Sequence, residues 1–224
     1  MNTQPASPFD PATAKPLPDS FFERPAETVA RELIGKVLVT SIGDTITAGV
    51  IVETEAYLGS DDPGSHAATK GITARNRVMY GPPGHAYVYF TYGNHHMLNL
   101  VTCAEGTAGA VLIRAVEPLL GTGTMSERRG GRTGVELTNG PGKLAQAFGI
   151  DLGHNGMALS GEIAVFPSDS PRSESVGTSG RIGLGAGHEL QLRFYLRGNA
   201  YVSKGRMGPK PPRRAAAAYK KENE

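Results

Sequence analysis

The stretch VIVETEAYLG, residues Val50–Gly59, decides how the rest of this sequence is interpreted. Its first half is apolar enough for a central strand of a sheet, and its second half brings two glutamates and a tyrosine. Side chains of an extended chain alternate between two faces, so Glu53, Glu55 and Tyr57 share one face. Strand ends that leave the core are places where functional sites are built. Two interpretations stay open: a partly desolvated general base, or a surface glutamate pair on an edge strand.

Hydrophobic periodicity and turn residues place further elements on both sides of this stretch. The predicted strands are Val37–Thr40, Ile46–Tyr57, Ala86–Thr91, Met97–Thr102, Ala110–Val116, Ile163–Phe166, Arg181–Leu184 and Leu190–Leu196. The predicted helices are a short one that opens at Pro25-Ala26-Glu27 and stops at Gly35, and one over Gly142–Gly149. Loops are expected from Ser60 to about Asn76 and over Gly121–Gly134. The pattern predicts one α+β domain over residues 18–203, a disordered leader at 1–17 and a basic disordered tail at 204–224.

Composition excludes several classes of protein. The chain has 224 residues, 39% of them hydrophobic, and no apolar run approaches the ~20 residues that cross a bilayer. Its N-terminus lacks the basic start and apolar core of a secretory signal. One cysteine, Cys103, allows neither an internal disulfide nor a cysteine-cluster metal site. We therefore expect a soluble cytoplasmic protein, associated with the nucleoid in a bacterium, with no membrane partner.

The distribution of charge points to nucleic acid. The net charge is +2, yet residues 204–224 carry seven Lys/Arg and two Glu, a net +5, which leaves −3 for residues 1–203. No Asp or Glu occurs between Asp62 and Glu105, a segment that holds four of the six histidines together with Lys70, Arg75 and Arg77. This segment predicts one electropositive surface. The tail either adds a non-specific attraction to phosphate polymers or is simply a solvated end.

Three other segments each allow a functional and a structural interpretation. Arg114 interrupts the apolar run VLIRAVEP, so it either pairs structurally with Glu53 or Glu117, or reaches the pocket of Glu55 and holds a water or a phosphate. In HAYVYFTYGNHH the aromatic residues suit a core, but Tyr92 begins a turn and is expected at an exposed hairpin tip, suited to stacking on bases. In NGPGK the helix start with Lys143 can receive a backbone phosphate, and helix capping alone is as simple an explanation.

Taken together, these segments resemble one family. From about Leu17 to Ser203 the chain is similar to the mammalian-type alkyladenine (3-methyladenine) DNA glycosylases, which remove alkylated purines from DNA. The segments that carry the resemblance occur in the same order: FFERPAETVARELIGKVLV, IVETEAYLG, His66, ARNRVMYGPPGHAYVYFTYGNHHMLN, VLIRAVEP, LTNGPGKLAQAFGI, RIGLG and LRFYLRGNAYVS. So many ordered segments are a far more specific signal than any single motif.

The resemblance assigns roles position by position. It implies that Glu55 is the general base, and that Arg114 and the Ile182 carbonyl hold the attacking water. It implies that Tyr57, His66 and Tyr89 sandwich the extruded base, that Asn99 screens purine substituents, and that Tyr92 fills the gap left in the helix. Apart from the resemblance, the carboxylate-free segment makes Arg75 and Arg77 candidates for contacts with the DNA backbone, and the helix start in NGPGK makes Lys143 a third. The implied fold is a single compact domain with a mostly antiparallel curved β-sheet, flanking helices and a protruding β-hairpin.

The implied function is that of a monofunctional DNA glycosylase of base excision repair. Such an enzyme flips alkylated or deaminated purines out of duplex DNA from the minor-groove side, and hydrolyses the glycosidic bond with a Glu-activated water. The lesion class comprises 3-methyladenine, 7-methylguanine, hypoxanthine and ethenoadenine. No cofactor and no metal is implied, and a monomer is expected. Two rival hypotheses are a non-catalytic nucleic-acid-binding module and a histidine-dependent metallohydrolase, for which His95-His96 is a weak signal.

Overall fold

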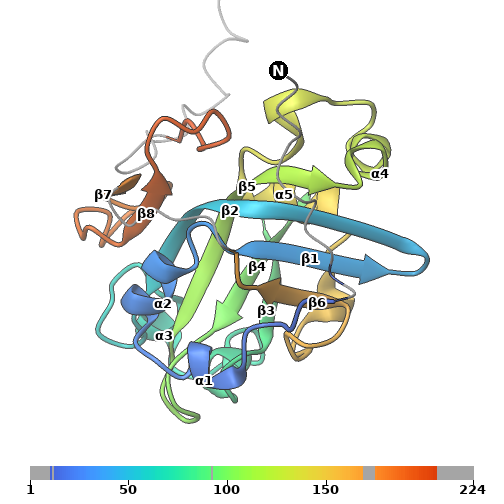
Figure 1. Cartoon of the computed structure of the whole chain (residues 1–224). Coiled ribbons are helices and arrows are strands. Elements are labelled where there is room, and N and C mark those ends of the chain that lie inside the picture. Colours follow the sequence, from blue (N-terminus) through green and yellow to red (C-terminus); the bar gives the residue numbers. More distant parts are fainter. Residues whose placement is uncertain (1–10, 12, 92, 169–174, 206–224) are drawn as a thin grey trace, which may run out of the picture.

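The central feature of the computed structural model, which describes residues 11, 13–91, 93–168 and 175–205, is one eight-stranded sheet (Figure 1). Its strand order is β3-β4-β5-β2-β1-β6, and β8 pairs with both β2 and β7. Every pairing among the described strands is antiparallel. The strands are β1 Val37–Ile42, β2 Thr45–Tyr57, β3 Ala86–Thr91, β4 His95–Val101, β5 Ala110–Leu120, β6 Ile163–Phe166, β7 Val176–Ser179 and β8 Arg193–Leu196.

Short helices cover this sheet. They are α1 Asp19–Phe22, α2 Ala26–Glu32, α3 His66–Lys70, α4 Thr122–Arg128 and α5 Pro141–Phe148, with 3-10 turns η1 Arg77–Tyr80, η2 Gly134–Leu137 and η3 Leu152–His154. Helix α2 packs against β2 and β5, and α5 packs against β4 and β5. Apolar residues of α2 and α5 join those of the sheet in the main core, including the Leu144, Ala147 and Phe148 stripe of α5. The α+β prediction is confirmed.

Several details of the predicted element map are wrong, and α1 and the 3-10 turns are absent from it. Residues 60–76 are not all loop, because α3 begins after Ser65, whose hydroxyl accepts the Ala67 N–H as an N-cap. The glycine-rich segment after Gly121 contains α4, which buries Met125 against the body. No strand lies at Arg181–Leu184, where the Arg181 side chain instead bonds the carbonyls of Ala56 at the end of β2 and of Gly187 in a loop. Strand β7 was not predicted.

A β-bulge in β2 decides which face of the sheet carries the glutamates. Ile51 belongs to the main core, whereas Thr54 donates its hydroxyl to Ala30 of α2 and Ala56 again joins the core. The register against β5 shifts between Ile51 and Glu53, so the side-chain alternation changes phase there. Glu53, Glu55 and Tyr57 consequently face away from α2, as the alternation from Glu53 onward predicts.

The β3–β4 hairpin forms one edge of the sheet and ends in an exposed turn. Its last paired residues are Thr91 and His95, and the tip residues Gly93 and Asn94 are exposed. Gly93 has φ +75°, a conformation that glycine adopts without strain. Tyr92 lies outside the described residues, as do most of the leader and residues 206–224 of the tail. Among the described residues, no helix is long and apolar enough to cross a membrane.

Candidate active site

The buried arginine of β5 joins the two glutamates of β2. Arg114 Nε lies 2.8 Å from Glu53 Oε1, and its Nη1 lies 3.2 Å from Glu55 Oε2. Arg114 therefore forms the structural pair with Glu53 and also reaches Glu55, so the two interpretations do not exclude each other. The alternative partner, Glu117, instead accepts a hydrogen bond from Asn199 at 2.6 Å. Burial lowers the pKa of Arg114, but the charges of Glu55 and Glu53 outweigh that effect and raise it, so Arg114 remains a cation.

The Glu55 carboxylate is fully buried and each of its oxygens has a donor. The Ile182 N–H donates to Oε1 at 2.7 Å, and the Tyr57 hydroxyl donates to Oε2 at 2.9 Å. Burial, followed by the charge of Glu55, raises the pKa of Tyr57 well above its usual value, so the hydroxyl stays protonated and remains a donor. A carboxylate has about four acceptor sites. Arg114 adds an ion pair rather than a hydrogen bond, so the two donors leave acceptor sites on Glu55 for a water or a substrate atom.

Glu53 is a structural counterion. Its carboxylate, which is fully buried, accepts from Arg114, from Arg193 Nε at 2.7 Å, and from both the N–H and the hydroxyl of Ser203 at 2.6 and 2.8 Å. Burial raises the pKa of Glu53, but the guanidiniums of Arg114 and Arg193 bring it below its usual value on balance. Glu53 thus accepts four hydrogen bonds and Glu55 two, so Glu55 is the glutamate with acceptor sites left for a further partner.

A pocket opens beside Glu55 on the same face of the sheet. Together with the open solvent at its mouth, it encloses about 350 Å³ of space free of protein atoms. Its lining contains four residues that the sequence predicted for a base pocket, Tyr57, His66, Tyr89 and Asn99, together with Gly64, Met79, Tyr87, Ala110 and Leu184. Tyr57 is common to the pocket and to the hydrogen-bond network of Glu55. The residues predicted for the base pocket therefore lie next to those predicted around Glu55.

Contacts among the aromatic side chains fix the shape of this pocket. The ring centroids of His66 and Tyr89 lie 4.8 Å apart at an interplanar angle of 69°. His66 Nδ1 is 3.0 Å from the Tyr87 hydroxyl, a fully buried partner that sequence analysis left unassigned. The amide nitrogen of Asn99 donates to the Tyr87 carbonyl at 3.1 Å. These edge-to-face and tilted contacts join the rings of His66, Tyr87 and Tyr89 into one aromatic cluster at the pocket.

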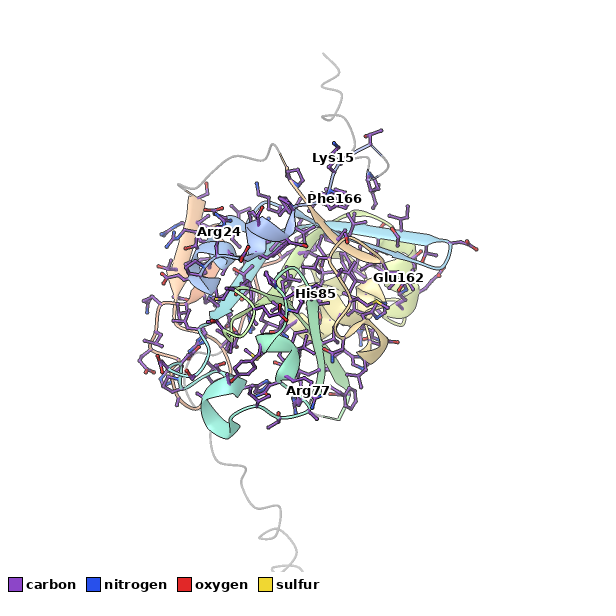
Figure 2. All side chains as sticks on the ribbon, turned by 90° about the horizontal axis from the view of Figure 1, so that it is seen from below. Lys15, Arg24, Arg77, His85, Glu162 and Phe166 are labelled. Carbon is purple, nitrogen blue, oxygen red and sulfur yellow. The ribbon has the colours of Figure 1, made fainter. Side chains whose placement is uncertain are left out.

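The predicted backbone contacts lie outside this pocket. Arg75 is exposed, stacks its guanidinium 4.8 Å from the Tyr89 ring centroid and donates to the Phe90 carbonyl at 3.3 Å. Arg77 is exposed and lies at the edge of the molecule, where η1 begins (Figure 2). Lys143 is bound to Glu136 at 2.7 Å and to Asn139, so a phosphate there would have to replace these partners. The described residues contain no group of three or more His, Cys, Asp or Glu side chains placed to hold a metal.

Sequence analysis missed a second buried ion pair behind the pocket. Asp62 and Arg181 have no exposed side-chain surface and are joined by two hydrogen bonds. The guanidinium carbon of Arg181 lies 4.8 Å from the Tyr57 ring centroid. Asp62 stands in a turn-rich SDDPGS segment and Arg181 begins RIGLG, and nothing local in either segment indicates that the two residues pair.

These buried carboxylates make stability sensitive to acid. Burial raises the pKa of Asp62, but its hydrogen bonds to Arg181 and to loop amides lower it on balance, and Glu53 behaves likewise. A carboxyl with a depressed folded-state pKa stabilises the fold above its unfolded pKa, about 4, and loses that contribution as pH falls through the folded value. We expect urea denaturation between pH 7 and pH 3 to give a steep loss of unfolding free energy below about pH 4. Asp62→Asn, already destabilised at pH 7, should show a shallower acid limb; an unchanged slope would contradict this assignment.

Comparison with known proteins gives a consistent result. The family model described as Methylpurine-DNA glycosylase (MPG) matches residues 20–200. A relative from Chlorobaculum tepidum is 45% identical over 203 residues, covering 89% of this chain and 96% of the relative. Relatives from Carboxydothermus hydrogenoformans and Methanoculleus marisnigri are 48% and 47% identical, each match covering 84% of this chain and 98% of the relative. All three carry the name "Putative 3-methyladenine DNA glycosylase".

Proposed function

Because this chain belongs to the methylpurine-DNA glycosylase family and is thus a DNA-repair enzyme that hydrolyses N-glycosyl bonds of DNA, we propose that it removes alkylated and deaminated purines by a Glu55-activated water. The family resemblance read from the sequence is confirmed. The observation that carries the proposal is the hydrogen bond between the Tyr57 hydroxyl, at the pocket wall, and the buried Glu55 carboxylate. This hydrogen bond links the pocket proposed for the base to a carboxylate that can accept a proton.

In the proposed reaction the damaged purine leaves the duplex and enters the pocket. Flipping costs a few kcal/mol, and Tyr92, which lies outside the described residues, would fill the vacated stack from the minor-groove side. Tyr57 and Tyr89 offer π faces to the base, and a cationic alkylated purine gains roughly 0.5–2 kcal/mol from each such contact. Arg75 and Arg77 would contact the DNA backbone, and Lys143 would do so by exchanging Glu136 for a phosphate.

The chemical step needs one base and one water. Glu55 accepts a proton from the water, and the water oxygen attacks the C1′ carbon of the sugar. The bond from C1′ to the purine nitrogen breaks, and its electron pair leaves with the base. The Glu55 charge also stabilises the oxocarbenium-like transition state, while Arg114 and the Ile182 backbone hold that carboxylate in place. The described residues that line the pocket include no lysine that would form a Schiff base, which favours a monofunctional enzyme.

The test is single-turnover base release from duplex oligonucleotides that carry one hypoxanthine, one ethenoadenine or methylated purines. The product should be an abasic site, so strand cleavage should require added alkali. Cleavage without alkali would contradict the monofunctional assignment. Tight binding with no base release from any of these duplexes would overturn the proposed activity. We further propose that the monomer is active, because one chain supplies Glu55, its partners and the lining of the pocket.

The basic C-terminal tail is expected to increase DNA affinity without affecting the chemical step. The chain enters this tail beside the site: Ser203, the residue before the tail, bonds Glu53, and a side chain on Gly205 would collide with Ile182. Removing residues 206–224, which carry six Lys/Arg and two Glu, should weaken binding at low salt and flatten the salt dependence by about 0.9 per lost phosphate contact. The saturating rate of base release should stay unchanged. Equal affinities and salt slopes for the two forms would assign the tail no role in binding.

A further inference from the structure

The buried Asp62–Arg181 pair lies behind the pocket and takes no part in the proposed reaction. Both side chains are fully shielded from solvent, and the guanidinium meets the carboxylate through two parallel hydrogen bonds. Such fork-to-fork pairing fixes the relative orientation of both groups, not merely their separation. Charges buried this deeply are tolerated only when they are paired and hydrogen-bonded.

The pair ties three separate segments together through their backbones. Arg181 donates to the carbonyls of Ala56, at 2.9 Å, and Gly187, at 3.0 Å, while Asp62 accepts from the amides of Leu58 and Gly64 at 3.1 and 2.9 Å. The end of β2, the loop after it and the loop after residue 180 are thereby held at one point. The close approach depends on Gly64, because a Cβ there would lie 2.7 Å from Arg181 Nη2.

This junction lies next to both donors of the Glu55 carboxylate. The Arg181 guanidinium stacks on the ring of Tyr57, whose hydroxyl holds Oε2. Arg181 is also the chain neighbour of Ile182, whose N–H holds Oε1. One guanidinium therefore supports the two groups that grip the two oxygens of Glu55. The tied segments also supply Tyr57, Gly64 and Leu184 to the pocket wall.

We propose that Arg181 and Asp62 are positioning residues for the glycosylase reaction, which set the orientation of the Glu55 carboxylate and the Tyr57 wall from behind. The inference rests on the proposed function, since it concerns the same general base. Its physical basis is that a misplacement of about 1 Å, even by a change remote from the chemistry, can cost 10²-fold in rate. Neither residue has exposed surface with which to bind DNA, so their effect should be confined to the step after binding.

Arg181→Lys is the decisive variant. A lysine retains the charge but lacks the planar fork, so it cannot bond both Asp62 oxygens, Ala56 and Gly187 while stacking on Tyr57. In single-turnover assays with a hypoxanthine duplex we expect base release to slow by about 10²-fold. The Kd for a duplex with an abasic-site analogue, which places no base in the pocket, should change by less than about threefold. Asp62→Asn, which keeps the size of the side chain, should show the same division between rate and affinity.

A matched structural control separates positioning from general loss of stability. Thr40→Val removes buried hydrogen bonds to Thr47 and to the Phe148 carbonyl, on another part of the sheet from the pocket. All variants are assayed at a temperature where circular dichroism shows them folded, and Thr40→Val should release base at the wild-type rate. Wild-type release by folded Arg181→Lys and Asp62→Asn would overturn the inference, as would equal losses of rate and abasic-duplex affinity. Absence of release by the wild-type protein would instead overturn the proposed function itself.

Discussion

Glu55→Gln is expected to slow single-turnover base release by about 10²–10⁴-fold, the usual contribution of a general base. Glutamine has nearly the same shape, so its amide oxygen can still accept from Ile182 or Tyr57, and Arg114 keeps Glu53 as its ion-pair partner. What is lost is the capacity to take a proton from water and the negative charge beside the sugar. Binding of the lesion duplex, measured by fluorescence anisotropy, should be equal to that of the wild type or tighter.

Glu117→Gln supplies the control for this experiment. Glu117 lies on the same strand as Arg114, but its carboxylate bonds Asn199 rather than any group of the site. Its replacement should therefore leave base release within about twofold of the wild-type rate, since the change removes no group from the reaction. If Glu55→Gln retained the wild-type rate, Glu55 would not be the base. The binding-module hypothesis predicts no base release by any of these forms.

Glu53→Ala is expected to lower the free energy of unfolding by about 3–5 kcal/mol, the cost of breaking a buried ion pair from one side. Removal of this carboxylate leaves Arg114 and Arg193 buried without their shared partner and frees the Ser203 amide. Urea denaturation followed by circular dichroism gives the comparison. The control is Glu32→Ala, whose exposed ion pair with Arg24 should contribute less than about 1 kcal/mol. Equal losses for the two variants would show that Glu53 is not the central counterion.

Most strands of the sheet and the cluster of Glu53, Glu55 and Arg114 were predictable because both rest on local patterns. Alternation along β2 places Glu53, Glu55 and Tyr57 on one face, and an arginine in an apolar strand must find a carboxylate. The glycine-rich composition around α4 concealed a helix, because its packing depends on one buried methionine rather than on a long apolar stripe.

Contacts between distant segments were beyond reach of the same reasoning. Asp62 and Arg181 are 119 residues apart, and Ser203 bonds Glu53 across 150 residues. Neither Asp62 nor Ser203 shows a local sign of burial, since an aspartate in a turn and a serine in a loop are ordinary surface residues. The helix start in NGPGK made Lys143 a candidate for a backbone phosphate, but the segment could not reveal that Glu136 already binds that ammonium group.

Because of the bulge in β2, the number of residues in this strand determines which face of the sheet carries Glu53 and Glu55. Between Ile51 in the core and Glu53 in the site, the chain changes phase within two positions. Losing one residue there would turn both glutamates toward the apolar face that packs on α2, and would turn Thr54 and Ala56 toward the face of the proposed pocket. A substitution in this stretch alters one side chain, whereas an insertion or deletion of one residue moves every following side chain of the strand to the opposite face of the sheet. The register of β2 thus decides whether the two glutamates face the side of the sheet that carries the pocket.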